Sequence, residues 1–355
     1  MGGNVVAPRR LMDALIREGV AVTDNRDESN YDLLDVHTPI PFTNILEVRR
    51  AKKRGIPVVM HAHTTAEDAK GTWTGSSALS GIIGRYLTFF YNKGDVVVAP
   101  SCWTKGTLEA RHVKTRIEVV SNGIDLERFR FDPERRKKFR ARYGIPEDAK
   151  VVYAVGVVCI KKGVEALPLV ARELPDLQFV WIGRRSRLYH PIQINKVISQ
   201  CPPNVRFLHD VEDVLDAHCG CDLFFTPSYV ENQGLALMEA MAVGRPVVAR
   251  NLKVYENLLV NGENAFTCGT TDEFTESLRR LSGNTGLASA FARGGKAALN
   301  DHEMSRVAKN LLTVYSSLLE PQGKKKPTRN HGSRMPHGSP LSADSSAAQI
   351  SHVRN

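Results

Sequence analysis

Short runs of β-branched and other apolar residues alternate along the chain with segments in which apolar residues recur every three or four positions. The runs predict strands, and the helical period predicts helices between them. Expected strands span residues 20–23, 33–37, 58–61, 96–99, 117–120, 151–155, 179–182, 205–208, 223–226 and 246–249. Expected helices span residues 9–18, 78–91, 133–143, 164–174 and 235–243. Strands interleaved with helices in this way predict βαβ units, parallel sheets and an α/β fold.

The strands fall into two sets, separated by the basic helix 133–143 and the turn 144–150. We therefore expect two doubly wound, Rossmann-like domains that face each other across a cleft, with ligands at the carboxyl ends of the strands. The expected units are an N-terminal domain (1–145), a C-terminal domain (146–300), a C-terminal helix that packs back towards the N-terminal domain (301–320) and a disordered basic tail (321–355). The tail is rich in Ser, Pro, Gly, His and Lys and has almost nothing to bury.

Composition narrows the class of protein. Lys and Arg number 48 against 38 Asp and Glu, and the excess lies in residues 1–150 and 321–355, which predicts an anionic surface that meets one domain. No apolar run is long enough to span a membrane, and no secretory signal is recognisable. Six cysteines without C-x-x-C spacing indicate reduced thiols and a cytoplasmic protein.

The densest chemical signal lies in residues 227–242, between an expected buried strand and the helix that follows it. The backbone N–H groups of Gly234 and Leu235 open that helix and form a candidate anion site. Glu231 precedes the helix and Glu239 lies two turns into it, so the two carboxylates can serve different parts of one ligand. A glutamate that only stabilises the helix dipole is the alternative.

This segment resembles the E-x7-E region of retaining glycosyltransferases of family 4, which have the two-domain GT-B fold. The similarity continues through Gly244-Arg-Pro-Val-Val, Tyr255-Glu256, Asn261-Gly-Glu-Asn264, Val98-Ala-Pro-Ser101 and Asn122-Gly-Ile-Asp125. The run His61-Ala-His63-Thr-Thr-Ala-Glu67-Asp68 resembles the H-T-x-x-E-D segment of members that glucosylate diacylglycerol. The resemblance covers nearly all of residues 1–320.

The resemblance implies a transferase that moves a hexose from a nucleotide-diphosphate sugar, bound by the C-terminal domain, to a lipid or membrane-associated acceptor bound by the N-terminal domain. It implies that Glu231 lies beside the anomeric carbon, that Glu239 holds the ribose and that His63 is the acceptor-side histidine. The other donor-binding residues it implies are Lys161, Lys162, Asn232, Gly234 and Leu235, and the acceptor or loop candidates are Gly2, Gly3, Glu67 and Asp68. Without the resemblance, a histidine at the end of a strand is more simply a core residue.

A nucleoside diphosphate leaving group needs neutralisation of phosphate charge, which lysine, arginine and helix N-terminal amides supply without a metal. The chain has no D-x-D pair, so we expect no metal and no other cofactor. Basic runs at 49–54 and 135–138 predict contact with an anionic membrane, each cation contributing about 1 kcal/mol. Solvated helix faces are the alternative for both runs. The apolar stripe of helix 78–91 is expected in the core, with a membrane-binding face as its alternative.

The chain departs from the family pattern in two places. The first glycine of the C-terminal domain is followed by Val157 where family members often carry Arg; Lys162 keeps the family lysine, and Lys161 either supplies the missing charge or is solvated. The chain also begins inside the glycine-rich loop that in the family follows the first strand. That strand is central in a doubly wound sheet, and its loss would open two buried edges. We expect an upstream strand, a truncated chain or another segment that fills the gap.

Three other functions stay open on the sequence. The same motifs serve transfer to a soluble glycan or polysaccharide precursor, and a truncated chain could bind a nucleotide sugar without turnover. The basic composition suggests a nucleic-acid-binding protein, but the sequence lacks interleaved aromatics, a recognition-helix motif and zinc spacing. We therefore expect a nucleotide sugar and an anionic membrane surface as partners, no nucleic acid, and a peripheral location at the cytoplasmic face of a membrane.

Overall fold

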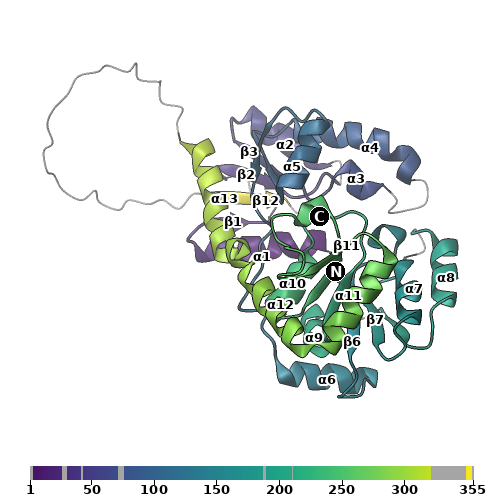
Figure 1. Ribbon diagram of the computed structural model, residues 1–355. Helices are drawn as coiled ribbons and strands as arrows, with labels where there is room; N and C mark the ends of the chain where they lie inside the picture. The colour runs from purple at the N-terminus through teal and green to yellow at the C-terminus, as the bar shows by residue number, and fades with distance from the viewer. Residues whose placement is uncertain are drawn as a thin grey trace, which may run out of the picture.

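The computed structural model describes residues 3–25, 30–40, 43–70, 76–186, 189–209, 211–320 and 349–353. These residues form two α/β domains, the N-terminal one at the top of Figure 1 and the C-terminal one at the bottom. Each domain has a six-stranded parallel sheet with a hydrophobic core on either face. This is the doubly wound, two-domain arrangement that the alternation of strands and helices predicts, and the GT-B architecture that the resemblance implies.

The N-terminal sheet has the order β1-β12-β2-β3-β4-β5. The elements of this domain are α1 (Gly3–Arg17), β1 (Ala21–Thr23), β2 (Leu33–Val36), α2 (Thr43–Lys53), β3 (Val58–His61), α3 (Ala66–Ala69), α4 (Ser76–Tyr91), β4 (Val96–Ala99), α5 (Cys102–Ala110), β5 (Arg116–Val119), the returning helix α13 (Met304–Leu319) and β12 (Gln349–Val353). Strands β2, β3 and β4 are buried along their whole length, as apolar strands covered on both faces must be.

The C-terminal sheet has the order β11-β10-β9-β6-β7-β8. Its elements are α6 (Pro133–Tyr143), β6 (Val151–Val155), the 3₁₀ turn η1 (Ile160–Lys162), α7 (Ala166–Arg172), β7 (Gln178–Ile182), α8 (Pro191–Ser199), β8 (Val205–Leu208), α9 (Val214–Gly220), β9 (Leu223–Thr226), α10 (Leu235–Val243), β10 (Val247–Arg250), η2 (Lys253–Tyr255), β11 (Phe266–Cys268), α11 (Thr271–Gly283), α12 (Thr285–Ala297) and η3 (Asn300–His302). The carboxyl ends of β6 and β9 lead into the two loops that form the donor side of the site.

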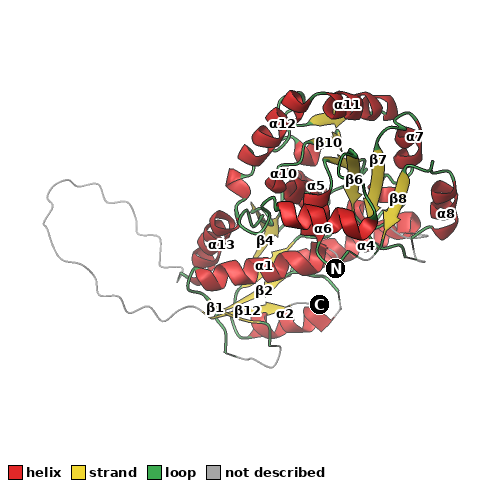
Figure 2. Cartoon of the chain, turned by 90° about the horizontal axis from the view of Figure 1, so that it is seen from below, coloured by secondary structure: helices red, strands yellow, loops and turns green. Residues whose placement is uncertain are grey.

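The C-terminal strand β12 lies inside the N-terminal sheet, between the edge strand β1 and β2 (Figure 2). It pairs in parallel with β1 on one side and with β2 on the other, so Ser351 lies between Thr23 and Leu34. The sequence placed these residues in a disordered tail, because their short apolar pattern predicts no strand by itself. Of the three explanations for the gap in the sheet, the structure has the third: another segment of the chain occupies the central position.

The packing boundary between the domains differs from the predicted one at residue 145. Helix α6 packs against α9, and its Phe139 lies in the core of the C-terminal domain. The fully buried Arg140 donates to the carbonyl of Gly220 and to the carboxylate of Asp222. Helix α6 therefore belongs to the C-terminal domain, because its apolar and charged contacts all lie there.

The chain returns from the C-terminal to the N-terminal domain through η3 and α13. Helix α13 packs against α1, and Leu311 and Tyr315 lie with Leu15 in the core on this face of the N-terminal sheet. Gly123 adopts φ +76°, and a Cβ there would come within 2.8 Å of the side chain of Met304. The Asn-Gly-Ile-Asp motif thus allows the chain to pass close to the start of α13. No helix in the described part of the chain is long and apolar enough to cross a bilayer.

We predict that Ser351→Pro destabilises the N-terminal domain. Proline removes a ladder hydrogen bond from a central strand, and an unpaired buried backbone group costs about 1–3 kcal/mol. Hydrogen exchange followed by mass spectrometry should show faster exchange of the amides of β1 and β2, with β6, β7 and β9 unchanged. Ser351→Ala, which keeps the backbone donor, is the control. Equal protection of β1 and β2 in both variants would contradict the central placement of β12.

Candidate functional site

The loop between β9 and α10 carries the site, because it ends at a helix N-terminus that points towards the N-terminal domain. Gly234 caps α10 with φ +88°, and a Cβ there would lie 2.8 Å from the ring of Tyr255. Only glycine fits this position without strain. The first N–H groups of α10, starting at Leu235, have no partners inside the helix and favour an anion. The backbone geometry at Gly234 and Leu235 therefore suits an anion, and the anion site stays a prediction.

Glu231 and Lys162 form the ion pair on the donor side. The Lys162 ammonium lies 2.5 Å from Oε1 of Glu231, and both side chains are mostly buried. Burial alone would raise the pKa of the Glu231 carboxyl, but the charge of Lys162 and its hydrogen bond bring that pKa below its usual value. Burial likewise opposes the charge on Lys162, and Glu231 raises the pKa of that ammonium above its usual value. Both groups are therefore charged at neutral pH.

Lys162 lies in the turn η1, and the glycine that follows it allows this turn to come close to Glu231. Gly163 adopts φ +72°, and a Cβ there would lie 2.1 Å from the carbonyl oxygen of Pro227. Glycine therefore allows η1 to pack against the loop that carries Glu231. Adjacent Lys161 points the other way along the interface: its ammonium lies 2.8 Å from Oδ1 of Asp68 in the N-terminal domain. Lys161 is therefore not a solvated side chain, because its charge is paired across the interface. Its expected role in supplying the missing charge to the donor stays a prediction.

Glu239 is separate from this pair and lies against an arginine and a histidine. Arg10 of α1 donates to its Oε1 at 2.8 Å, and His218 Nε2 lies 3.5 Å from its Oε2. Burial raises the pKa of this carboxyl, and His218 and Arg10 lower it further than burial raises it, so the carboxylate is ionised at neutral pH. Arg10 crosses from the N-terminal domain to make this contact. The two glutamates of the motif thus have different partners, as expected for two roles.

Asn232 was predicted to bind the donor, but its polar atoms contact the N-terminal domain. Its Nδ2 donates to the carbonyl of His63 at 2.8 Å, and its Oδ1 accepts from the hydroxyl of Thr65. Its backbone carbonyl accepts from the hydroxyls of Ser101 and Thr104. In the structure Asn232 therefore joins the domains, because both ends of the amide are already occupied across the interface.

Gln233 also joins the two domains, and the sequence did not identify it as a site residue. Its buried Nε2 donates to the hydroxyl of Ser121 at 2.6 Å, and its Oε1 accepts from the N–H of Asn122. The hydroxyl of Ser121 also lies 2.9 Å from Nδ1 of His302 in η3. The position of Gln233 between the two glutamate-bearing segments is the signal that could have identified it.

The acceptor-side candidates lie on the N-terminal half of the interface. Thr65 caps helix α3, which begins the segment of Glu67 and Asp68. Glu67 pairs with Arg111 at 2.6 Å within the same domain, whereas Asp68 faces Lys161 across the interface. Gly3 is the first residue of α1, where a loop was expected, and Gly2 lies outside the described residues.

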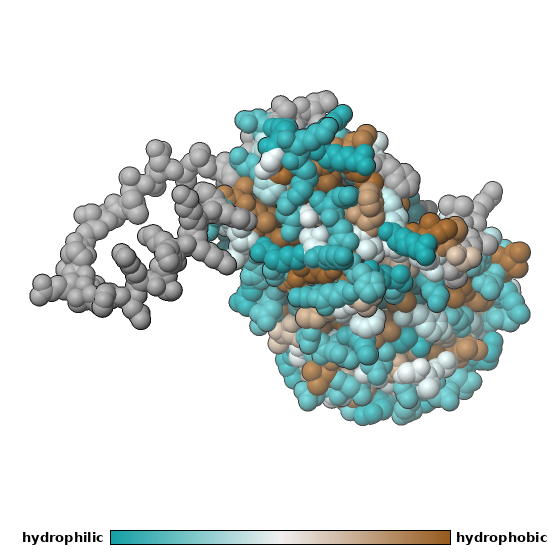
Figure 3. All heavy atoms as spheres, turned by 90° about the horizontal axis from the view of Figure 1, so that it is seen from above, coloured by the Kyte–Doolittle hydropathy of each residue, from teal (hydrophilic) through white to brown (hydrophobic). Residues whose placement is uncertain are grey.

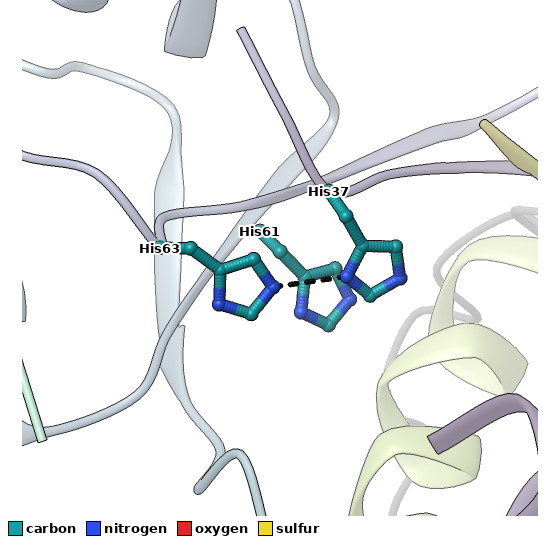
Figure 4. A group of neighbouring side chains, drawn as sticks. All are labelled: His37, His61 and His63. Atoms are coloured by element: carbon teal, nitrogen blue, oxygen red, sulfur yellow. Dashed lines mark hydrogen bonds between the residues drawn. The ribbon is translucent and has the colours of Figure 1, made fainter. Parts of the chain in front are cut away.

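His63 is buried in a group of three histidines with His37 and His61 (Figure 4). Burial first, and then the neighbouring His37 and His61, hold the pKa of His63 well below its usual value. The imidazole is therefore neutral at physiological pH, and one of its nitrogens is a hydrogen-bond acceptor. His37 and His61 follow or end neighbouring parallel strands, and this was the available signal for them. No pattern in the sequence marked Arg10 as a site residue, because it is one of several basic residues on an amphipathic helix.

Two doubly wound domains that meet across a lysine–glutamate pair and the N-terminus of a helix define a glycosyltransferase of the GT-B type. The model of Glycosyltransferase Family 4 matches residues 3–128, and that of Glycosyl transferases group 1 matches residues 135–298. The chain belongs to the family 4 glycosyltransferases.

Curated relatives cover most of the chain. The processive diacylglycerol alpha-glucosyltransferase of Acholeplasma laidlawii is 27% identical over 301 residues, which are 84% of this chain and 88% of that protein. The alpha-galactosylglucosyldiacylglycerol synthase of Streptococcus pneumoniae is 25% identical over 314 residues, 86% of this chain and 79% of that protein. The fold is shared with Anabaena HepE, solved in complex with UDP and glucose, with a TM-score of 0.69 at 19% identity over 88% of this chain and 81% of that chain.

We predict that Lys162→Ala weakens the binding of a nucleoside diphosphate about tenfold or more. A hydrogen-bonded charge contributes about 1.5–3 kcal/mol, and each 1.4 kcal/mol is about tenfold in affinity. Isothermal titration with UDP, and with GDP and ADP in parallel, measures the effect. Lys161→Ala is the matched control, with a smaller expected effect because its partner is Asp68. Equal binding by Lys162→Ala and the parent chain would remove Lys162 from the phosphate site.

We predict that Glu231→Ala mainly lowers kcat, whereas Glu239→Ala mainly weakens donor binding. Glu231 is in the loop beside Lys162, and Glu239 lies two turns into α10 against Arg10. Steady-state kinetics with donor as the varied substrate separates kcat from KM, and direct titration gives the donor Kd. Equal and small effects of both substitutions on both constants would reject the division of roles.

Proposed function

We propose that this glycosyltransferase moves a hexose from a nucleoside diphosphate sugar to a lipid acceptor, with retention of configuration at the anomeric carbon. The observation that carries the proposal is the meeting of the Lys162 ammonium, the Glu231 carboxylate and the open N-terminus of α10 at the interdomain face. This combination suits a ligand with a sugar at one end and a diphosphate at the other.

On the donor side, Lys162 and the N–H groups of α10 would neutralise the charge that develops on the diphosphate as the glycosidic bond breaks. Glu231 would lie beside the sugar, and Glu239 would accept hydrogen bonds from the ribose hydroxyls. Donor binding would exchange the Lys162–Glu231 ion pair for a lysine–phosphate contact, and the Glu231 carboxylate would then face the sugar. These groups supply the positive charge that a divalent cation would otherwise provide, and we propose that none is required.

The acceptor is assigned to the N-terminal domain, where His63 and the segment of Glu67 and Asp68 face the donor loop. Two of the similar proteins are named for transfer to diacylglycerol or its glycosides. This supports a glycerolipid acceptor for the present chain, and it is consistent with the H-T-x-x-E-D resemblance around His63.

Two surface features of the N-terminal domain support contact with an anionic membrane. A cavity of about 630 Å³ is lined by one end of α2 and by the turn after α4, and includes Arg49, Lys53 and Lys93. On α4, Ile82 is 66% exposed and Phe89 44% exposed. The sequence analysis expected the stripe of α4 in the core; only part of it is buried, and the remainder forms an exposed apolar face. Hydrophilic and hydrophobic patches alternate on the face seen in Figure 3.

The second basic run does not take part in this surface. Arg135 pairs with Asp213 and Asp216, and Arg136 pairs with Asp222, all within the C-terminal domain. These arginines hold α6 against α9. We therefore propose no membrane contact for these two arginines, since their charges are paired inside the domain.

We predict turnover with UDP-hexose and diacylglycerol in vesicles that contain anionic lipid, and lower turnover in purely zwitterionic vesicles. The paired variant Arg49→Ser/Lys53→Ser should reduce vesicle pelleting and the salt dependence of binding, because each lost cation removes about 1 kcal/mol at an anionic surface. Lys137→Ser/Lys138→Ser, exposed on α6, is the matched control. Turnover of a soluble glycan in place of the lipid would favour transfer to a polysaccharide precursor. Donor binding without any turnover would favour an inactive nucleotide-sugar-binding protein.

Excess chelator tests the proposed independence from metal in the same assay. We expect the rate to be unchanged. Loss of turnover that added Mg²⁺ or Mn²⁺ restores would contradict the proposal.

A further inference from the structure

A chain of hydrogen-bonding side chains runs from the interior of the N-terminal sheet to His63. His37 Nδ1 lies 3.0 Å from Nε2 of His63, and the two rings are nearly coplanar, with 12° between their planes (Figure 4). On its other side, Nε2 of His37 lies 3.4 Å from Oδ2 of Asp35. All three residues are almost fully buried. The sequence links them through β2, at whose end Asp35 and His37 lie, and the segment after β3, which carries His63.

Asp35 is a buried carboxylate that its neighbours stabilise by donating hydrogen bonds. The hydroxyl of Tyr315, from α13, donates to Oδ2, and His61 Nε2 lies 3.2 Å from the same oxygen. Burial first, and then the carboxylate of Asp35, raise the pKa of Tyr315 well above its usual value, so this hydroxyl keeps its proton. When Asp35 is ionised it only accepts hydrogen bonds, and the nitrogen of His37 that faces it then carries a proton.

The positions of the protons on His37 and His63 follow from the Asp35 end of this chain of hydrogen bonds. With a proton on Nε2, the neutral ring of His37 has a lone pair on Nδ1, and the facing Nε2 of His63 must then carry the donated proton. We infer that His37 is a positioning residue that, together with Asp35, fixes His63 as the Nε2–H tautomer and leaves its Nδ1 as a hydrogen-bond acceptor. One consequence rests on the proposed function: the substrate group that meets His63 is a hydroxyl, which donates a hydrogen bond.

The surroundings of His63 place it at the face between the domains. Burial lowers the pKa of the His63 ring most, and the side chain of Asn122 acts against this and raises it. Asn122 belongs to the Asn-Gly-Ile-Asp segment between the domains, and its backbone is held by Gln233 from the donor loop. The carbonyl of His63 itself accepts from Asn232. His63 thus lies at the interdomain face, where a substrate hydroxyl can meet the ring nitrogen that does not face His37.

A metal site is the competing explanation for three adjacent histidines. The ring nitrogens of His37, His61 and His63 lie within 4.8 Å of one another, and in the described part of the chain they form the single group of this kind. Two nitrogens bound to one tetrahedral zinc at 2.0–2.1 Å are about 3.3 Å apart, whereas those of His37 and His63 are 3.0 Å apart and point at each other. The rings of His37 and His61 stack face to face with centroids 4.1 Å apart, so their in-plane lone pairs do not converge. The geometry fits a proton chain and not a metal.

The first test reads the tautomer directly. Two-bond ¹H–¹⁵N spectra of chain labelled at the histidine rings, with the His63 signals assigned by comparison with His63→Asn, should show His63 with a protonated Nε2 and an unprotonated Nδ1 near neutral pH. In His37→Leu, which cannot accept the hydrogen bond, His63 should shift to a mixture of tautomers. An Nδ1–H form of His63 in the parent chain, or a tautomer unaffected by His37→Leu, would overturn the inference. This result does not depend on any substrate, so it stands apart from failure of the proposed transferase activity.

The second test separates positioning from stability. His37→Leu and Asp35→Asn should lower kcat about tenfold or more with the donor Kd unchanged. His61→Leu is the matched control: it is equally buried, stacks on His37 and contacts Asp35, but no hydrogen bond joins it to His63. It should cost comparable stability in thermal unfolding with little effect on kcat. Equal losses of kcat in His37→Leu and His61→Leu would show that the loss comes from disturbed packing, and would reject the inference.

Elemental analysis of the purified chain completes the test. We expect no stoichiometric transition metal. One equivalent of zinc in the parent chain that is lost in both His37→Leu and His61→Leu would overturn the inference. It would show that the three histidines form a metal site.

Discussion

Two consecutive amide side chains, those of Asn232 and Gln233, hold the N-terminal domain against the loop that begins α10. Every polar atom of these side chains has a partner across the interface: the carbonyl of His63, the hydroxyl of Thr65, the hydroxyl of Ser121 and the N–H of Asn122. The same loop carries Glu231 and ends at the helix N-terminus. The position of one domain relative to the other and the geometry of the donor side are therefore set by the same few hydrogen bonds, and a substitution in this loop changes both.

Charge neutralisation shapes the rest of the interface. Three carboxylates at the interface face a cation: Glu231 faces Lys162, Glu239 faces Arg10, and Asp68 faces Lys161. The pairs of Glu239 and Asp68 join the two domains, and breaking a buried pair by removing one partner costs several kcal/mol. A nucleoside diphosphate offers replacement partners for the same cations. Donor binding can therefore change the partners of these cations and leave them paired.

The N-terminal sheet depends on a segment from the far end of the chain. Strand β12 lies between β1 and β2, and β2 ends beside Asp35 and His37. A doubly wound sheet without a central strand would leave unpaired backbone groups on both inner edges. Strand β12 therefore supports the element that presents the histidine chain to the interface, and it couples the C-terminal segment of the polypeptide to the acceptor side of the site.

The sequence by itself determined the donor loop and ten of the strands of the two sheets, whereas β11 and β12 were not predicted. Strands such as Val58–His61 and Leu223–Thr226 have the predicted bounds, because apolar β-branched runs covered on both faces carry a strong local signal. Gly234 and Glu231 were identifiable because a loop, a helix start and a carboxylate lie within a few residues of one another. Tertiary structure alone decided the contacts between distant segments: the insertion of β12, the pairing of Arg10 with Glu239, the transfer of α6 to the C-terminal domain and the turn of Asn232 away from the donor. These depend on partners up to several hundred residues apart, and no local pattern of polar and apolar positions records which distant group a side chain will meet.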